Sequence, residues 1–176
     1  ALTLDPEVKC YLPGIPRATY LPYPFQIFHN ADTLFFAYEY AGAVRNVLFR
    51  DPGPAPIDSW MGQSVGKWEG DTLVVETTGQ HDQSWLDRAG NFHSEALRVV
   101  ERFTPTSPHT LRYEATLEDP KVYTRPWKVA WVLQRVTEPG FELIEEACIE
   151  GERSMEDIRQ QGGYRWYFGE SWRFYR

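Results

Sequence analysis

The fold of this chain is decided by the stretch from Trp60 to Phe103, which reads WMGQSVGKWEGDTLVVETTGQHDQSWLDRAGNFHSEALRVVERF. Apolar residues alternate along 64–69, 71–78 and 95–103, and this pattern predicts three strands. A polar connection from Gly79 to Ser94 separates the second strand from the third. Connections of that length are uncommon in a compact domain and are often functional. We therefore expect a β fold with its candidate site on or near this connection.

The flanking sequence adds six further strand candidates, separated by Pro, Gly, Asn and Asp residues typical of turns. They lie at 25–29, 33–40, 44–50, 111–118, 127–134 and 141–148. Nine short strands joined by hairpin turns predict an all-β fold. The expected form is an antiparallel meander that closes into a lipocalin-like barrel, with a β-sandwich as the alternative. The 176 residues fit a single domain.

The two ends of the chain differ from this pattern. Residues 1–24 contain five prolines and predict an extended, irregular lead-in that crosses the outside of the barrel. Residues 150–162 predict one short surface helix that ends at a pair of glycines. Residues 163–176 interleave arginines with aromatic residues, and we expect this tail to dock on the barrel or on a partner.

Composition excludes two classes of partner. The net charge of -7 argues against nucleic acid, because phosphate contacts need a basic surface. No apolar run approaches the ~20 residues of a membrane span.

No signal peptide precedes LTLDPEV, which is consistent with numbering that starts at a processed or trimmed end. Aromatic residues make up 15% of the chain and fit either a ligand cavity or ordinary core packing.

The chain has two cysteines, Cys10 and Cys148. A bridge between them would close nearly the whole domain and contribute on the order of 4–5 kcal/mol in the chain-entropy treatment. It would also imply an oxidising compartment, whereas the alternative is two buried thiols. Neither cysteine has a CxxC or Cys/His neighbour, and the four histidines lack a metal-binding spacing. We therefore expect no metal and no cofactor.

The connection carries the candidate catalytic residues His81, Asp82, Asp87 and His93. A carboxylate beside an imidazole fixes its tautomer and raises its basicity, which suits general acid–base chemistry. The alternative is a loop in which the aspartates accept turn hydrogen bonds and His93 caps the next strand.

Glu101 is a further candidate, because the strand register places it on the apolar face with Val99 and Phe103. Burial raises the pKa of a carboxyl group unless the group is paired, and perturbed carboxylates often mark functional sites. The alternatives are an ion pair with an arginine of a neighbouring strand and a one-residue bulge that turns Glu101 outward.

Aromatic residues supply the candidate ligand-binding set. Tyr38, Tyr113, Trp127 and Trp131 would line the cup of the barrel. The connection, which contributes Trp85 and Arg88, would lie over the mouth, with Tyr123 in the loop at 119–126.

Several long motifs follow one another in this chain: CYLPGIPR at 10–17, GKWEGDTLVVETTG at 66–79, then WLDRAG, HSEALRVVERF and DPKVYTRPW. On these motifs the chain resembles a large uncharacterised family of secreted bacterial proteins over roughly residues 6–150. The resemblance implies a periplasmic or secreted location and favours the bridge between Cys10 and Cys148. It implies no catalytic residues. A weaker resemblance, through Gly66-Lys67-Trp68, is to lipocalin-like barrels.

The leading functional hypothesis is a secreted or periplasmic barrel that binds a small hydrophobic or aromatic molecule. The first alternative is an enzyme on the same barrel, an isomerase, lyase or hydrolase that uses the candidate acid–base residues. The second is a structural or assembly subunit that self-associates or docks on a protein partner through its C-terminal tail.

Overall fold

The structure, a computed structural model, describes residues 4–144 and 146. Eight strands form one sheet in chain order, and every neighbouring pair is antiparallel except β3 and β4. The strands are β1 (Phe25–His29), β2 (Thr33–Tyr38), β3 (Val44–Leu48), β4 (Gln63–Glu69), β5 (Thr72–Thr78), β6 (Arg98–Ser107), β7 (Thr110–Glu118) and β8 (Trp127–Gln134). The helical elements are single turns: η2 (Pro6–Lys9), α1 (Arg17–Tyr20) and η3 (Tyr40–Gly42).

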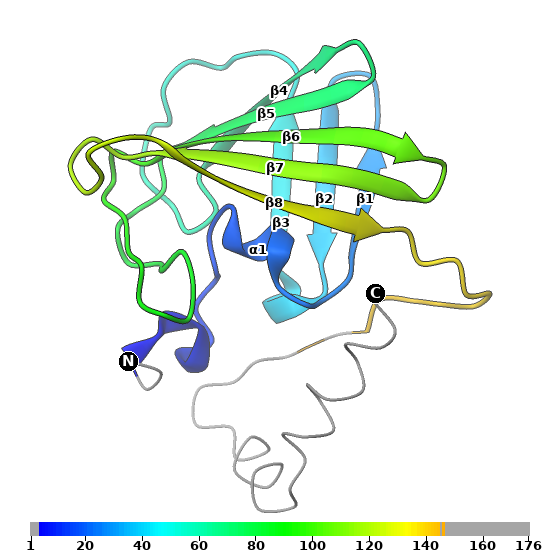
Figure 1. The fold of residues 1–176 in the computed structure, drawn as a ribbon, viewed down its shortest axis with the longest axis horizontal. Helices are drawn as coiled ribbons and strands as arrows, with labels where there is room; N and C mark the ends of the chain where they lie inside the picture. The colour runs from blue at the N-terminus through cyan, green and yellow to red at the C-terminus, as the bar shows by residue number, and fades with distance from the viewer. Residues whose placement is uncertain (1–3, 145, 147–176) are drawn as a thin grey trace, which may run out of the picture.

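The sheet curls strongly, so that β4 to β8 run across β1 to β3 as two arms of one half-barrel (Figure 1). The strands β1 and β8 form its two edges, and within the described part of the chain they do not pair with each other. The all-β, barrel-like fold predicted from the sequence is therefore confirmed.

Eight of the nine strand candidates correspond to observed strands. The ninth, at 141–148, is wrong over its described residues, because 141–144 and 146 adopt no strand. The remainder of that candidate lies outside the described residues, as do the expected helix at 150–162 and the tail at 163–176.

Period-two alternation decides which side chains enter the half-barrel. In β6 the side chains of Val99, Glu101 and Phe103 are buried, and in β7 those of Tyr113 and Ala115 are buried. Each β6 residue of this set lies opposite an inward residue of β7, for example Phe103 opposite Tyr113. The burial of Glu101 that its register predicts is thereby confirmed, and no bulge turns it outward.

The joint between β3 and β4 departs from the expected meander. These strands run parallel and pair at only two positions, Val47 with Ser64 and Leu48 with Val65. A parallel pair needs a crossover instead of a hairpin, and the Pro-rich segment at 51–62 supplies it. Gly62 ends this crossover at φ 65°, where a Cβ would lie 2.6 Å from a carbonyl oxygen of β5. Only glycine fits there.

The lead-in enters the half-barrel, so its expected place on the outside is wrong. Ile15 and Ala18 are buried in the main core, and Ile15 is only 1% exposed. The side chain of Gln80 accepts from the backbone N–H of Ile15 at 2.7 Å and donates to its carbonyl at 3.0 Å. An irregular segment can be buried here because Gln80 satisfies the polar groups that no strand partner reaches.

Buried charges hold the start of the lead-in. The guanidinium of Arg17, 1% exposed, donates to both carboxylate oxygens of Asp5 at 2.7 and 2.9 Å and also to Glu7. Arg88 of the connection pairs with the other oxygen of Glu7 at 2.5 Å. Burial alone would lower the pKa of Arg17, but the two carboxylates outweigh it and raise that pKa above its usual value. The network ties the lead-in to the connection.

Cys148 lies outside the described residues, so the bridge to Cys10 stays a prediction, as does the periplasmic or secreted location. Across 4–144 and 146, the helical segments are too short to cross a bilayer.

Candidate functional site

A pocket of about 790 Å³ opens at one end of the half-barrel, between the β1–β2 turn, the β4–β5 hairpin and the far ends of β6 and β7. We call it the mouth pocket. Its lining is mostly apolar and includes Ile27, Leu34, Phe49, Trp68, Phe103 and Leu111. Ligand pockets in proteins typically have this size and this predominance of apolar and aromatic side chains.

Trp68 marks the rim of the mouth pocket. Its side chain is 59% exposed, which is unusual for a tryptophan, and it stacks on Phe49 at 6.5 Å between ring centroids. The polar rim residues include Lys67, which pairs with Glu69 at 2.8 Å. The rim therefore combines the accessible aromatic surface of Trp68 with the ion pair of Lys67 and Glu69.

The connection at 79–94 lies at the opposite end. The rim contains Asp71, just before the start of β5, whereas Gly79 follows the end of the same strand. The contacts of Arg88 and Trp85 with the lead-in place the connection at that far end. The expectation that the connection covers the mouth is therefore wrong.

A central polar cluster lies deeper in the half-barrel than the mouth pocket. Arg45 of β3 pairs with Glu101 of β6, a strand from the other arm. Arg45 also donates to Ser64 at 2.8 Å and to Thr77 at 2.7 Å, and Tyr113 donates to Glu101 at 2.8 Å. These five residues, which we call the central cluster, are at most 2% exposed. Glu101 thus has the arginine partner that was one alternative, but this partner comes from across the barrel rather than from a neighbouring strand.

The charges of the central cluster are balanced. Burial alone would lower the pKa of Arg45, but the carboxylate of Glu101 outweighs it and raises that pKa above the usual value. Burial likewise raises the pKa of Tyr113 well above its usual value, so its hydroxyl stays a donor. Arg45 also lies over the ring of Phe36, with its guanidinium carbon 5.6 Å from the ring centroid. The Nη1 atom of Arg45 is buried, and no described residue accepts a hydrogen bond from it.

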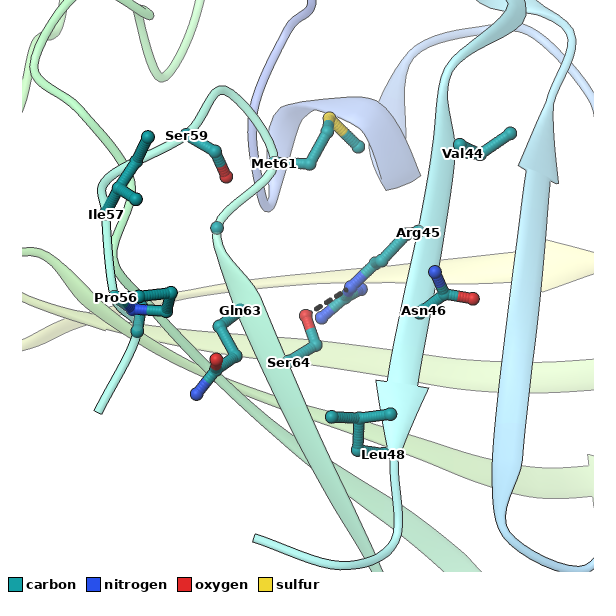
Figure 2. Close-up of a pocket in the computed structure, with 12 residues that line it drawn as sticks. Val44, Arg45, Asn46, Leu48, Pro56, Ile57, Ser59, Met61, Gln63 and Ser64 are labelled. Carbon is teal, nitrogen blue, oxygen red and sulfur yellow. Dashed lines mark hydrogen bonds between the residues drawn. The ribbon is translucent and has the colours of Figure 1, made fainter. Parts of the chain in front are cut away.

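A second pocket, of about 320 Å³, lies between β3 and the crossover, next to the two-residue joint of β3 and β4. We call it the strand-gap pocket. Val44 and Arg45 line it from β3, Ile57 from the crossover, and Gln63 and Ser64 from β4. Figure 2 shows the side chain of Arg45 reaching from β3 across the gap to Ser64.

His93 and Ser84 form a buried pair within the connection. Each is 2% exposed, and the Nε2 atom of His93 lies 2.8 Å from the Ser84 hydroxyl. The other ring nitrogen, Nδ1, lies 2.9 Å from the backbone carbonyl of Ser94. A carbonyl only accepts, so Nδ1 carries the proton and Nε2 accepts from Ser84. A Cβ at Gly14 would lie 2.7 Å from the Ser84 hydroxyl, which shows that the lead-in covers this pair.

The remaining catalytic candidates do not gather around one reacting position. Asp87 accepts from the backbone of Ala89 and Asn91, as a turn residue does. His81 accepts from the backbone of Gln83, and Asp82 is exposed. In the described part of the chain no hydrogen bond joins these carboxylates or Glu101 to either histidine.

The candidate ligand-binding residues are spread over the molecule. Tyr38 and Tyr113 are packed into the core, at 4% and 0% exposed. Trp127 is partly buried and contacts Tyr123 edge-on, whereas Trp131 is 39% exposed and stacks on Tyr20. None of them lines the mouth pocket.

The other two candidates, Trp85 and Arg88, lie together with Tyr123 at the end of the half-barrel opposite the mouth pocket. The hydroxyl of Tyr123 donates to the backbone carbonyl of Phe92 at 2.7 Å. The backbone carbonyl of Trp85 accepts from Arg17 at 3.4 Å, and Arg88 pairs with Glu7. These contacts hold loops in place rather than surround a cavity.

Sequence reasoning missed the mouth-pocket residues Phe49, Trp68 and Leu111. One signal was available for Trp68, which follows Ser64 and Gly66 on the inward face of its strand yet sits next to the turn at Gly70. Among the described residues, no group of three or more His, Cys, Asp or Glu side chains is arranged to hold a metal. No protein family model, curated protein or solved structure matches this chain.

The buried His93 predicts a pH dependence of stability. Burial lowers the pKa of His93 below its usual 6.5. The unfolded chain therefore binds more protons than the folded chain below about pH 6.5, and the free energy of unfolding should fall as the pH decreases from 7.5 to 5.5. Urea denaturation at both pH values measures this slope.

The matched controls for that experiment are two histidine variants. His93→Gln should flatten the dependence, whereas His109→Gln, on an exposed turn, should leave it unchanged. An equal slope in the wild type and in His93→Gln would refute the assignment.

Proposed function

We propose that this protein binds a small, largely apolar or aromatic molecule in the mouth pocket. The observation that carries the proposal is the pocket itself, about 790 Å³ of mostly apolar space at the open end of the half-barrel. Removing apolar surface from water contributes roughly 25 cal/mol per Å², so a ligand that fills such a pocket gains substantial affinity.

The rim supports an aromatic ligand in particular. Trp68 is exposed and stacks on Phe49, and a second flat ring can extend this stack into the pocket. Offset stacking between aromatic rings contributes about 0.5–1.5 kcal/mol beyond burial of area. Lys67 at the rim is already paired with Glu69, and most of the lining is apolar, which favours a neutral ligand over a charged one.

N-phenyl-1-naphthylamine, a neutral fluorescent aromatic compound, tests this proposal. We expect saturable binding, a rise in probe emission and quenching of tryptophan emission. The quenching should shrink in Trp68→Phe, because Trp68 is the tryptophan among the described residues that line the pocket.

A pair of charge substitutions locates the binding. Leu111→Glu places a carboxylate in the pocket lining and should weaken binding about tenfold or more, because an unpaired charge next to an apolar ligand loses solvation. Val132→Glu, at a residue that is 62% exposed and outside the pocket, is the matched control and should bind as the wild type does. Equal binding by both variants would contradict the proposal.

A further inference from the structure

The arm formed by β1, β2 and β3 has an outer face whose side chains are apolar or neutral. Strand register places Phe28 opposite Phe35 and Ala37 opposite Val44 on this face, away from the core. Phe28 and Val44 are 49% and 50% exposed, and the rings of Phe28 and Phe35 lie 6.3 Å apart between centroids. We call this surface the outer apolar face, after its members Phe28, Phe35, Ala37, Val44 and Leu48. None of them lines the mouth pocket.

The corresponding face of the other arm is charged. Arg98, Arg102 and Arg112 lie on the outward side of β6 and β7, and each pairs with a carboxylate. An antiparallel sheet with one face in the core normally carries such polar side chains on the face that meets water. An exposed apolar surface instead marks a place where another segment or molecule binds. The outer apolar face therefore has the composition of a covered surface.

The strand-gap pocket opens on this same face. Val44 and Leu48 line the pocket together with Pro56 and Ile57 of the crossover, and Ile57 is 72% exposed. Pockets for small molecules span roughly 300–1,000 Å³. A volume of about 320 Å³ is at the lower end of that range and suits one inserted side chain.

The last described residues lie beside this arm. The backbone N–H of Ile144 donates to Glu39 at 3.1 Å, and Glu146 accepts from the backbone N–H of Ala41 at 3.2 Å. Ala41 belongs to η3, which joins β2 to β3. Sixteen residues, 147–162, separate Glu146 from the tail at 163–176. At about 3.3 Å per extended residue, that length can span roughly 50 Å and so reaches any part of the arm.

The tail at 163–176 complements the outer apolar face in composition and in charge. It contains seven aromatic residues, three arginines and one glutamate. The loops that border the face carry the carboxylates of Asp32, Glu39 and Asp51 and one arginine, Arg50. A second copy of the chain, related by a two-fold axis, would bring the same carboxylates towards each other. The tail brings arginines to them instead.

We propose that the C-terminal tail at 163–176 docks on the outer apolar face, with an aromatic side chain in the strand-gap pocket and its arginines at the acidic border. The tail is tethered close to the surface that it covers. Such a tether gives an effective concentration of about the millimolar range, so contacts that are weak between separate molecules form within one chain.

A soluble gadolinium chelate, added to the ¹⁵N-labelled full chain, tests whether the face is covered. Nuclear magnetic resonance should show at least threefold less broadening for the amides of Phe35 and Asn46 than for those of Arg102 and Glu114 on the charged face. Equal broadening of the two faces overturns the proposal. Sedimentation velocity on the same sample should give the mass of a monomer. A dimer would assign the protected face to a second copy and would also overturn the proposal.

A matched pair of substitutions tests whether the tail is the occupant. Val44→Lys places a positive charge on the outer apolar face, where it repels the arginines of the tail. Val132→Lys, at a residue 62% exposed on the outward side of β8, is the control. An arginine-specific protease should cleave after Arg165 and Arg173 at least fivefold faster in Val44→Lys than in the wild type, and at the wild-type rate in Val132→Lys. Mass spectrometry measures these rates.

Two results of the protease experiment would refute the docked tail. One is an equal rate of tail cleavage in the wild type and in Val44→Lys, and the other is an equal acceleration by both lysine substitutions. Urea denaturation checks that each variant is folded. Should Val44→Lys fail to fold, the gadolinium comparison decides, because it uses the wild-type chain.

Discussion

Replacing Glu101 by leucine should lower the free energy of unfolding by about 3–5 kcal/mol, because the substitution leaves the guanidinium of Arg45 buried without its counter-charge. Arg45 is 2% exposed, so water does not replace the lost counter-charge in the folded protein. Tyr113 also loses the acceptor of its hydroxyl. Urea denaturation of the wild type and of Glu101→Leu measures the difference.

The double variant Arg45→Met, Glu101→Leu is the control that separates charge from packing. Replacing both members of a buried ion pair by apolar residues is often nearly neutral. Ser64 and Thr77, which lose Arg45 as donor, still lie 2.9 Å from each other and can form a hydrogen bond. We therefore expect the double variant to be more stable than Glu101→Leu. A double variant that is less stable than the single one would contradict this account.

Arg17→Met should also lower the free energy of unfolding by about 3–5 kcal/mol, because it removes the arginine partner of the buried Asp5 and one of the two arginine partners of Glu7. Asp5 is 1% exposed and Glu7 is 7% exposed, and Asp5 pairs with Arg17 through both oxygens. Arg88 continues to neutralise Glu7, so the unpaired carboxylate of Asp5 accounts for most of the lost stability. The loss is again read from urea denaturation curves, and limited proteolysis should show faster cleavage within the lead-in.

Arg98→Met is the matched control for Arg17→Met. Arg98 also pairs with two carboxylates, those of Glu76 and Glu118, but all three side chains are between 44% and 50% exposed. Exposed ion pairs contribute about 1 kcal/mol or less. If the two arginine variants lost equal stability, burial would not be the cause.

The sequence predicted the strands well because most of them bury one face, as the alternating burial in β2 and β3 shows. The alternation of Leu34, Phe36 and Tyr38 does not depend on the conformation of the loops, and all three side chains are buried. The parallel joint of β3 and β4 escaped prediction, because a Pro-rich segment such as 51–62 excludes regular structure without specifying the direction of the next strand.

Burial in the lead-in and the partners of buried charges were harder to predict. Prolines specify the backbone of residues 1–24 but say nothing about whether Arg17 or Ile15 faces water. Glu101 was expected inside, yet its partner on β3 becomes a neighbour only when the sheet curls. The mouth pocket also depends on the curl of the sheet, since Phe49 and Leu111, which are far apart in the sequence, line it from the two arms.

The burial of the lead-in also affects when its contacts can form during synthesis. Residues 5–21 are synthesised before their partners, because Gln80, which holds Ile15, lies 65 positions later in the chain. Arg88, which holds Glu7, lies 81 positions later. The lead-in therefore stays without these partners until the residues up to Arg88 have been synthesised. Contacts so distant in sequence form slowly. The lead-in therefore depends, for its place in the core, on residues that lie far along the chain.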